Sequence, residues 1–271
     1  MRNLLKTDLQ RVLKDKLFIA LCIIAGAFAF VGPVLYKLLF SALNAEELLS
    51  MLGMEVNGKM LFFNAFKPGD NLGLVAPILI AIILCKDFSH GTIRNKIICG
   101  KSRTSVFLSL FTTAWIYICG IILAHALLTL LLSLMFFEYQ ATAFTWKDLG
   151  YLLLSIGFEI FVFSFIAALI IFLCVSMRKA GLVIVLYIAV VFFFAIVGGV
   201  TMIAEQFSTP DTSAAKLLEI FNKINIFSST LIGGSTSYSI SDLLYIILPP
   251  VLGTALFGWL GLKIFKKKDL K

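Results

Sequence analysis

Long uncharged runs of apolar residues alternate along the chain with shorter segments that carry the charges. A helix that crosses a bilayer needs about 20 predominantly apolar residues. Five runs reach that length, and they cover residues 17–36, 104–137, 149–177, 180–204 and 243–262. The run 149–177 contains one charged residue, Glu159, and is counted here as continuous. Each of these five runs predicts a membrane-spanning helix.

A sixth run, residues 71–85, contains only 15 residues and is short for a span. We expect its helix to begin earlier in the chain or to lie partly buried inside the protein. The run 104–137 is instead too long, because its 34 residues would form about 51 Å of helix and must protrude, tilt or break. With flanking residues included, the predicted spans are 17–39, 66–85, 104–137, 148–177, 180–204 and 243–264.

The composition agrees with a membrane protein and argues against a soluble enzyme. Hydrophobic residues make up 60% of the chain and charged residues 14%, whereas a soluble domain is roughly half apolar and a quarter charged. We therefore expect a single all-α integral membrane domain over residues 1–271, with six transmembrane helices.

The basic residues indicate which way the chain crosses the membrane. The formal net charge is +8, and with six spans 17 of the 23 lysines and arginines fall on one side. These residues lie in the amino-terminal segment, in two loops and in the carboxyl-terminal tail. Because basic loops stay in the cytoplasm, we expect both termini to be cytoplasmic, in a bacterial plasma (inner) membrane. The excess charge then reports topology, and no nucleic-acid partner is expected.

Residues 1–16 predict an amphipathic helix, because five apolar residues recur there at helical spacing and basic residues fill most of the rest. Such a helix is suited to lie on the inner membrane surface; the alternative is a solvated, charged flank of the first span. On the outer side, short helices are expected around Ala45–Leu52 and within the segment 205–242, at Lys216–Ile226.

Several kinds of chemistry have no support in the sequence. The five cysteines have no CxxC spacing and form no cluster with histidine, so neither a metal site nor a disulfide framework is expected. Gly100-Lys101-Ser102 resembles the end of a P-loop, but the motif needs a glycine where Asn95 stands. We expect no catalytic residues and no cofactor in this chain.

The loop between the second and third spans, residues 86–103, is the segment most informative about function. It reads KDFSHGTIRNKIICGKSR. Thr92–Cys99 can form two helical turns, with Ser89 or Thr92 as the cap at the start and Gly100 as the terminating residue. A short helix of this kind on a cytoplasmic loop is typical of a docking element for a partner protein. The alternative is a basic anchor that obeys the positive-inside rule and binds nothing.

The same loop resembles the coupling segment of type-2 ABC transporter permeases, the group of bacitracin-resistance, lantibiotic-immunity and amphipathic peptide-toxin exporters. Its pattern is acidic-aromatic-x-x-Gly-Thr-x-(Arg/Lys)-(Asn/Gln)-(Lys/Leu), with an aspartate here in place of the usual glutamate. The resemblance implies a coupling helix that contacts an ATPase subunit. The residues that it assigns to this role are Asp87, Phe88, Gly91, Thr92, Arg94, Asn95 and Lys96.

The resemblance also implies a function and a set of partners. The chain would be the permease subunit of an ABC exporter for amphipathic or hydrophobic peptides, in toxin export or antimicrobial-peptide immunity. Its partners would be two ABC ATPase subunits and a second permease copy, identical or related, within the lipid bilayer. ATP and magnesium would bind to the ATPase and not to this chain, which would not itself be an enzyme.

Two polar residues inside the predicted spans leave alternatives open. Glu159 lies near the middle of the fourth span, where a carboxylate is costly and usually faces the bundle interior or a wet cavity. It is part of a substrate path or a buried packing residue. His125 in the third span is either a hydrogen-bonded packing residue or a ligand. A pair formed by Glu159 and His125 would favour a proton-coupled secondary transporter. A non-transporting scaffold or sensor accessory is the other alternative.

Overall fold

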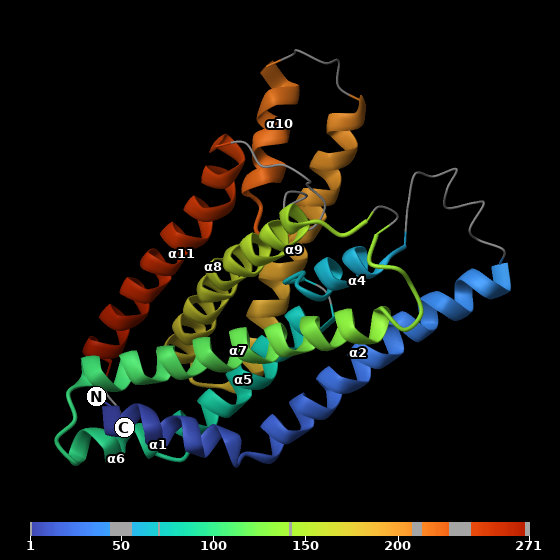
Figure 1. The fold of residues 1–271 in the computed structure, drawn as a ribbon. Coiled ribbons are helices and arrows are strands. Elements are labelled where there is room, and N and C mark those ends of the chain that lie inside the picture. Colours follow the sequence, from blue (N-terminus) through green and yellow to red (C-terminus); the bar gives the residue numbers. More distant parts are fainter. Residues whose placement is uncertain are drawn as a thin grey trace.

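The computed structural model describes residues 2–43, 56–69, 71–140, 143–207, 213–227 and 240–268. The helices expected around Ala45–Leu52 lie outside these ranges. The described residues form ten helices and no strand (Figure 1). The helices are α1 Arg2–Leu13, α2 Lys16–Leu43, α4 Gly58–Ala65, α5 Asn71–Ser89, α6 Thr92–Ile98, α7 Arg103–Ser133, α8 Trp146–Met177, α9 Ala180–Phe207, α10 Ser213–Ile224 and α11 Ile240–Lys267.

Six of these helices are long and apolar enough to cross a membrane, namely α2, α5, α7, α8, α9 and α11. The prediction of an all-helical fold is therefore confirmed for the described residues, and six membrane-capable helices, the number expected from the sequence, indicate a multi-pass membrane protein. The longest run of the sequence forms one unbroken helix, α7, which ends at Ser133 with Leu134 as its C-cap. The helix α10 starts at Ser213, three residues before the amphipathic segment expected from the sequence.

The shortest span, α5, differs from its expected position. It begins at Asn71 and not near residue 66, and it continues past Lys86 and Asp87 to Ser89. Asp87 is paired with Arg11 of α1 and Lys86 with Asp15, just after α1, so the helix continues through both residues without leaving a charge unpaired. The expectation of partial burial agrees with the structure, because 56% of the apolar part of α5 is buried inside the protein.

The helix α8 forms the centre of the fold. It contacts α5, α7, α9 and α11, and 67% of its apolar part is buried. Its capping box, in which Thr145 and Asp148 bond to each other's backbone N–H, fixes the start of the helix. On the α7 side, the indole N–H of Trp115 donates to Ser164 Oγ at 2.6 Å. These contacts make α8 the helix around which the other spans pack.

The outer spans α2, α9 and α11 bury few of their apolar side chains completely. Only 11% of the apolar part of α11 and 17% of that of α9 are buried. Among the exposed residues are Ile23 of α2, Phe193 of α9 and Trp259 of α11. A water-soluble protein rarely leaves apolar patches of this extent uncovered, so these faces are suited to lipid or to a partner in the membrane.

The carboxyl-terminal and amino-terminal ends of the chain lie at the same end of the molecule, beside α6 (Figure 1). Arg103, at the start of α7, donates to the carbonyl oxygens of Phe265, Lys266 and Lys268. Lys268 in turn donates to the Ser176 carbonyl at the end of α8. The basic segments that the sequence assigns to one side of the membrane are thus gathered at one end of the fold.

The helices α8 and α11 are in close contact at a glycine. A Cβ atom added to Gly253 would lie 2.4 Å from Cδ2 of the Phe165 ring, whereas a Cβ atom at Gly258 would meet nothing within 4 Å. Phe165 also packs edge-on against Phe257 and Phe227, so its ring has little freedom to move away. The small size of Gly253 is therefore what lets α11 pack on the central helix.

Replacing Gly253 by alanine is expected to destabilise the protein by about 1–3 kcal/mol, the usual result of overpacking a filled contact. Gly258→Ala is the matched control on the same helix and is expected to be neutral or slightly stabilising, because alanine has the higher helix propensity. Thermal unfolding in detergent micelles measures both. Equal melting temperatures for the two variants would contradict the proposed close contact.

Candidate functional site

The short helix α6 is held at both ends by glycines with positive φ angles. Gly91 is the N-cap at φ 69° and makes no side-chain cap bond, so the expectation that Ser89 or Thr92 caps the helix is wrong. The Ser89 hydroxyl instead donates hydrogen bonds to the Cys85 and Lys86 carbonyl oxygens. At the other end Gly100, at φ 81°, donates to Ile97 O and Lys101 donates to Lys96 O. This is a Schellman ending, with Gly100 at the position expected from the sequence.

Three ion pairs join α1 and the connection that follows it to the end of α5 and to α6. Lys96 Nζ lies 2.5 Å from Asp8 Oδ1, and Lys86 Nζ lies 3.1 Å from Asp15 Oδ2. The third pair joins Arg11 to Asp87. Asp8 and Arg11 stand three residues apart on one face of α1, whereas Asp15 lies in the two-residue connection between α1 and α2. We call these three pairs the α1 clamp.

Two carboxylates of the α1 clamp are almost completely buried. The side chain of Asp8 is 1% exposed and that of Asp87 is 2% exposed. Asp8 also accepts a hydrogen bond from Ser109 Oγ of α7 at 2.7 Å, so both of its oxygens are satisfied. Charge-assisted bonds of this kind are stronger than neutral ones. The clamp therefore fixes α1 against both α6 and α7.

Burial and neighbouring charges shift the pKa values of two members of the clamp, Lys96 and Asp15. Burial lowers the pKa of the Lys96 ammonium, against the hydrogen bond and negative charge of Asp8, which raise it. For Asp15, partial burial alone would raise the pKa, but the Leu17 N–H bond and the Lys86 ion pair outweigh it and the pKa is lowered. Asp15 is therefore the ionised N-terminal cap of α2, because its Oδ1 accepts from Leu17 N at 2.9 Å.

The apolar stripe of α1 faces the protein and not only the membrane surface. Leu4 and Val12 belong to the main hydrophobic core, and Asp8 lies between them on the same helix face. The Tyr117 hydroxyl of α7 also donates to the Leu9 carbonyl at 2.5 Å. The sequence analysis missed Asp8, although its spacing of four residues from both Leu4 and Val12 marks it as an acidic residue on the buried face.

Only part of the predicted coupling set remains exposed. Arg94 and Asn95 are exposed, and Ile98 has 70% of its surface exposed. Ile93 is buried and Ile97 packs against the core, so these two isoleucines, four residues apart, share the inward face of α6. The outward surface of α6, which we define as Arg94, Asn95 and Ile98, is what the helix offers to a partner.

The other predicted coupling residues make contacts within the chain. Asp87 and Lys96 belong to the α1 clamp, so the expectation that they contact acidic or basic groups of a partner is not supported by their position. Phe88 packs edge-on against Phe265 of α11, with ring centroids 6.4 Å apart. Gly91 and Thr92 are half-buried at the start of α6. These five residues position the helix, whereas its outward surface is free to bind.

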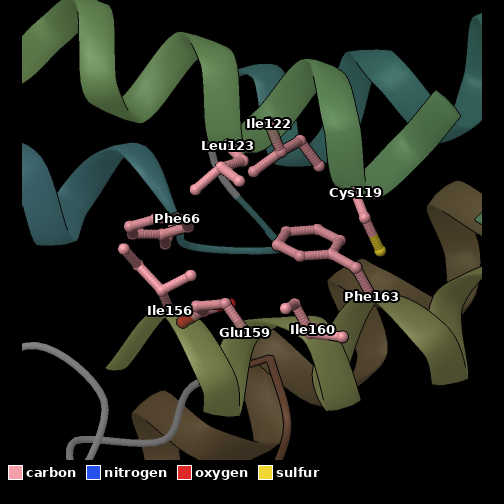
Figure 2. A pocket seen from close by; sticks show the side chains of 8 residues that line it. All are labelled: Phe66, Cys119, Ile122, Leu123, Ile156, Glu159, Ile160 and Phe163. Atoms are coloured by element: carbon pink, nitrogen blue, oxygen red, sulfur yellow. The ribbon is translucent and has the colours of Figure 1, made fainter. Parts of the chain in front are cut away.

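Glu159 lies between α7 and α8 in an apolar cage (Figure 2). Its side chain is 2% exposed, and neither carboxyl oxygen has a hydrogen-bond partner. The cavity beside it has a volume of about 10 Å³ and is lined by Phe66, Cys119, Ile122, Leu123, Ile156, Ile160 and Phe163. That is room for about one water molecule. The cage holds the carboxyl group but is too small for a cargo molecule.

His125 is buried elsewhere in the fold and does not pair with Glu159. Its Nδ1 lies 3.0 Å from the Ala25 carbonyl oxygen of α2. Because a carbonyl oxygen only accepts, Nδ1 is the protonated nitrogen of this bond. His125 lines a separate cavity of about 240 Å³. The Glu159–His125 pair considered from the sequence is therefore not formed.

The described residues contain no cluster of three or more potential metal ligands, and the cysteines in them are free thiols. Cys85 Sγ of α5 and Cys174 Sγ of α8 lie 3.5 Å apart in the core, which the sequence spacing did not reveal. The α1 clamp and the outward surface of α6 thus form the candidate functional site, with Glu159 and His125 as separate buried polar positions.

Removing one partner of a buried ion pair is expected to destabilise the fold more than removing both. Asp8→Leu leaves Lys96 without its counter-charge, and Lys96→Met does the same to Asp8, so each single change should cost about 3–5 kcal/mol. The double variant should be more stable than either single variant. Glu219→Gln, in an exposed pair with Lys223, is the control and should change stability by about 1 kcal/mol or less. Additive losses in denaturant unfolding would contradict a coupled pair.

No curated protein matches the chain. Residues 68–271 match the family described as "Protein of unknown function (DUF2705)". The matched segment runs from just before α5 to the carboxyl terminus and includes α6, His125 and Glu159. Because it covers more than half of the chain, this membrane protein belongs to the DUF2705 family.

Proposed function

We propose that the chain is the permease subunit of an ATP-driven exporter of the type-2 ABC class, in the bacterial plasma membrane with both termini in the cytoplasm. The observation that carries the proposal is the construction of α6. It is a short helix with an exposed outward surface, firmly attached to the spans by the α1 clamp.

Two further features support this assignment. The loop that contains α6 has the residue pattern of an ABC coupling segment, and it lies between the second and third of six membrane-capable helices. It also lies at the same end of the fold as both termini (Figure 1). A helix that receives motion from a cytoplasmic ATPase needs this combination of exposure and rigid attachment.

The attachment defines how force would pass from the ATPase to the spans. A push on Arg94, Asn95 or Ile98 would move α6, and the Lys96–Asp8 pair would carry that movement to α1. Only Lys14 and Asp15 separate α1 from α2, and Asp15 is bound to Lys86 of α5. The clamp would therefore move α1, α2 and α5 together against α8.

The proposed complex contains two copies of the ATPase and a second permease copy. ATP and magnesium would act on the ATPase, whose closure on nucleotide would draw the two α6 helices together. The exposed apolar faces of α9 and α11 leave room for a second permease and for a path between the copies. Amphipathic or hydrophobic peptides are the proposed cargo, by resemblance to the exporter group.

The geometry gives less support to a proton-coupled transporter. Such a carrier needs neighbouring titratable groups that exchange a proton. Glu159 has no hydrogen-bond partner, and His125 is bonded to the Ala25 carbonyl and lines another cavity. An ATP-driven mechanism needs no such relay.

Reversing the charge of Arg94 is expected to weaken binding of the ATPase subunit. Arg94 is exposed, so Arg94→Glu should leave the fold intact while placing a negative charge against the partner, at a loss of about tenfold or more in affinity. Purification of the tagged chain from its native membranes, followed by mass spectrometry, measures the amount of co-purified ATPase. Phe88→Ala is less suitable, because Phe88 packs against Phe265.

Lys14→Glu is the matched control for this experiment, since Lys14 is also exposed and lies between α1 and α2, outside the outward surface of α6. It makes the same change in net charge and should retain the ATPase. If both variants bind the ATPase as well as the wild-type chain, or if no ATPase accompanies the wild-type chain, the exporter proposal is wrong.

A second experiment tests the orientation. A cysteine introduced at Lys267 should react with a membrane-impermeant maleimide only after the cells are opened, because the positive-inside rule puts this end in the cytoplasm. A cysteine at Lys147, at the start of α8, should react in intact cells. Both variants are made in a chain whose exposed Cys22 and Cys99 are replaced by serine. Labelling of the Lys267 position from outside would refute the topology.

A further inference from the structure

The cavity beside His125 has the construction of a binding site. It lies between α2, α4 and α7, at the start of α5, and its volume is about 240 Å³. That is close to the lower end of the range for small-molecule sites, roughly 300 Å³. It is distinct from the small cage around Glu159, because the two sets of lining residues have no member in common.

The floor of this cavity is polar and deeply buried. His125 and Thr129 stand one helical turn apart on α7 and are 4% and 6% exposed. Thr129 Oγ1 has no hydrogen-bond partner. His125 donates from Nδ1 to Ala25 O, which leaves Nε2 of the neutral ring as an acceptor. A buried hydroxyl that is left without a partner is costly. A ligand that formed a hydrogen bond with the Thr129 hydroxyl would remove this cost and would bind more tightly.

The rim of the cavity is apolar and faces outward. Phe28, Val31 and Leu35 of α2 line it and are among the large hydrophobic residues that the structure exposes. They lie within the part of α2 that is apolar enough to be in the membrane. The cavity therefore opens between helices toward the hydrocarbon region, from which a molecule with an apolar tail can enter.

We propose that this cavity binds an uncharged amphiphile, a molecule with a neutral hydroxyl or amide head and an aliphatic tail. The head would donate to His125 Nε2 and exchange a hydrogen bond with Thr129, and the tail would lie along Phe28, Val31 and Leu35. Binding at this site does not require the ATPase, so the binding proposal can be tested independently of the exporter proposal.

The described residues of the lining carry no charge, which favours the neutral class. The polar residues of the lining are His125, Thr129, Asn64, Asn71 and Tyr36, and no described residue of the lining is a lysine, arginine, aspartate or glutamate. A phosphate, carboxylate or ammonium head would lose its hydration there without gaining a counter-charge. A neutral head loses less on leaving water and finds both a donor and an acceptor.

Photoaffinity labelling tests the proposal directly. The purified full-length chain in detergent micelles is exposed to an oleyl alcohol analogue that carries a diazirine on its tail, and the labelled peptides are identified by mass spectrometry. We expect labelling near residues 28–36 and 61–65. Unlabelled oleyl alcohol should compete, whereas oleyl sulfate and oleyltrimethylammonium, which have permanent charges, should compete at least tenfold more weakly.

Two variants separate the floor from its surroundings. Thr129→Val keeps the shape of the side chain but removes the hydroxyl, and it should weaken competition by oleyl alcohol about fivefold. Thr113→Val is the matched control, because Thr113 is also on α7 and also has a buried, unpartnered hydroxyl but does not line the cavity. It should bind as the wild-type chain does, and neither change should impair folding.

A third variant fills the cavity from its rim. Gly32 lines it, and a Cβ atom added there meets nothing within 4 Å, so Gly32→Leu should be tolerated and should reduce labelling to background. The proposal is overturned if labelling is spread over the exposed faces of α9 and α11, if the charged amphiphiles compete as well as the alcohol, or if Thr129→Val and Thr113→Val behave alike. It is also overturned if cross-linking shows that a second copy of the chain covers Phe28 and Leu35.

Discussion

The burial of Asp8 between α1, α6 and α7 is the constraint on which the arrangement of this end of the molecule depends. A carboxylate removed from water is tolerated only with a counter-charge and hydrogen bonds, and Lys96 and Ser109 supply both. Lys96 comes from α6 and Ser109 from α7. If α1 moved away, Lys96 would lose its counter-charge and Ser109 would lose its hydrogen-bond acceptor. Buried pairs of this kind contribute more to a unique register than to net stability.

The other two pairs of the α1 clamp extend this effect along the chain. Arg11 compensates Asp87, and Asp15 compensates Lys86, which allows α5 to continue as a helix beyond its apolar run. Asp15 also caps α2. The helix α1 and the two residues that follow it, Lys14 and Asp15, therefore determine where α2 begins and where α5 ends. These contacts are the physical basis for the proposal that a movement of α6 is transmitted to the two spans α2 and α5.

Much of the fold was predictable because the membrane imposes a simple rule on sequence. Each long uncharged run became a helix, and the six membrane-capable helices follow from length and hydropathy alone. The end of α5 was not predictable in this way, since Lys86 and Asp87 read as loop residues unless their partners 71 and 76 positions earlier are known. The orientation argument is unaffected by these pairs, because the positive-inside rule counts lysine and arginine and gives acidic residues little weight.

The candidate site was predictable only in part, for a related reason. The loop pattern located α6 and its inward Ile93, and the glycine at position 100 ended the helix as expected. A single sequence does not tell which polar residues of such a segment face the protein and which face outward. Asp87, Lys96 and Arg94 all fit the pattern of the ABC coupling segment. The tertiary contacts distinguish Asp87 and Lys96, which hold the helix in place, from Arg94, which remains exposed.

The two buried polar positions illustrate the same limit inside the membrane. Glu159 and His125 looked equivalent in sequence, as single polar residues within long apolar runs. In the fold, the cage of Glu159 has room for about one water molecule, whereas His125 borders an open cavity and shares it with an unpartnered threonine hydroxyl. A polar group that is sealed in apolar side chains has little to offer a ligand unless α7 and α8 separate. A polar floor beneath an apolar rim already has both components that an amphiphile needs, and it therefore carries the binding proposal.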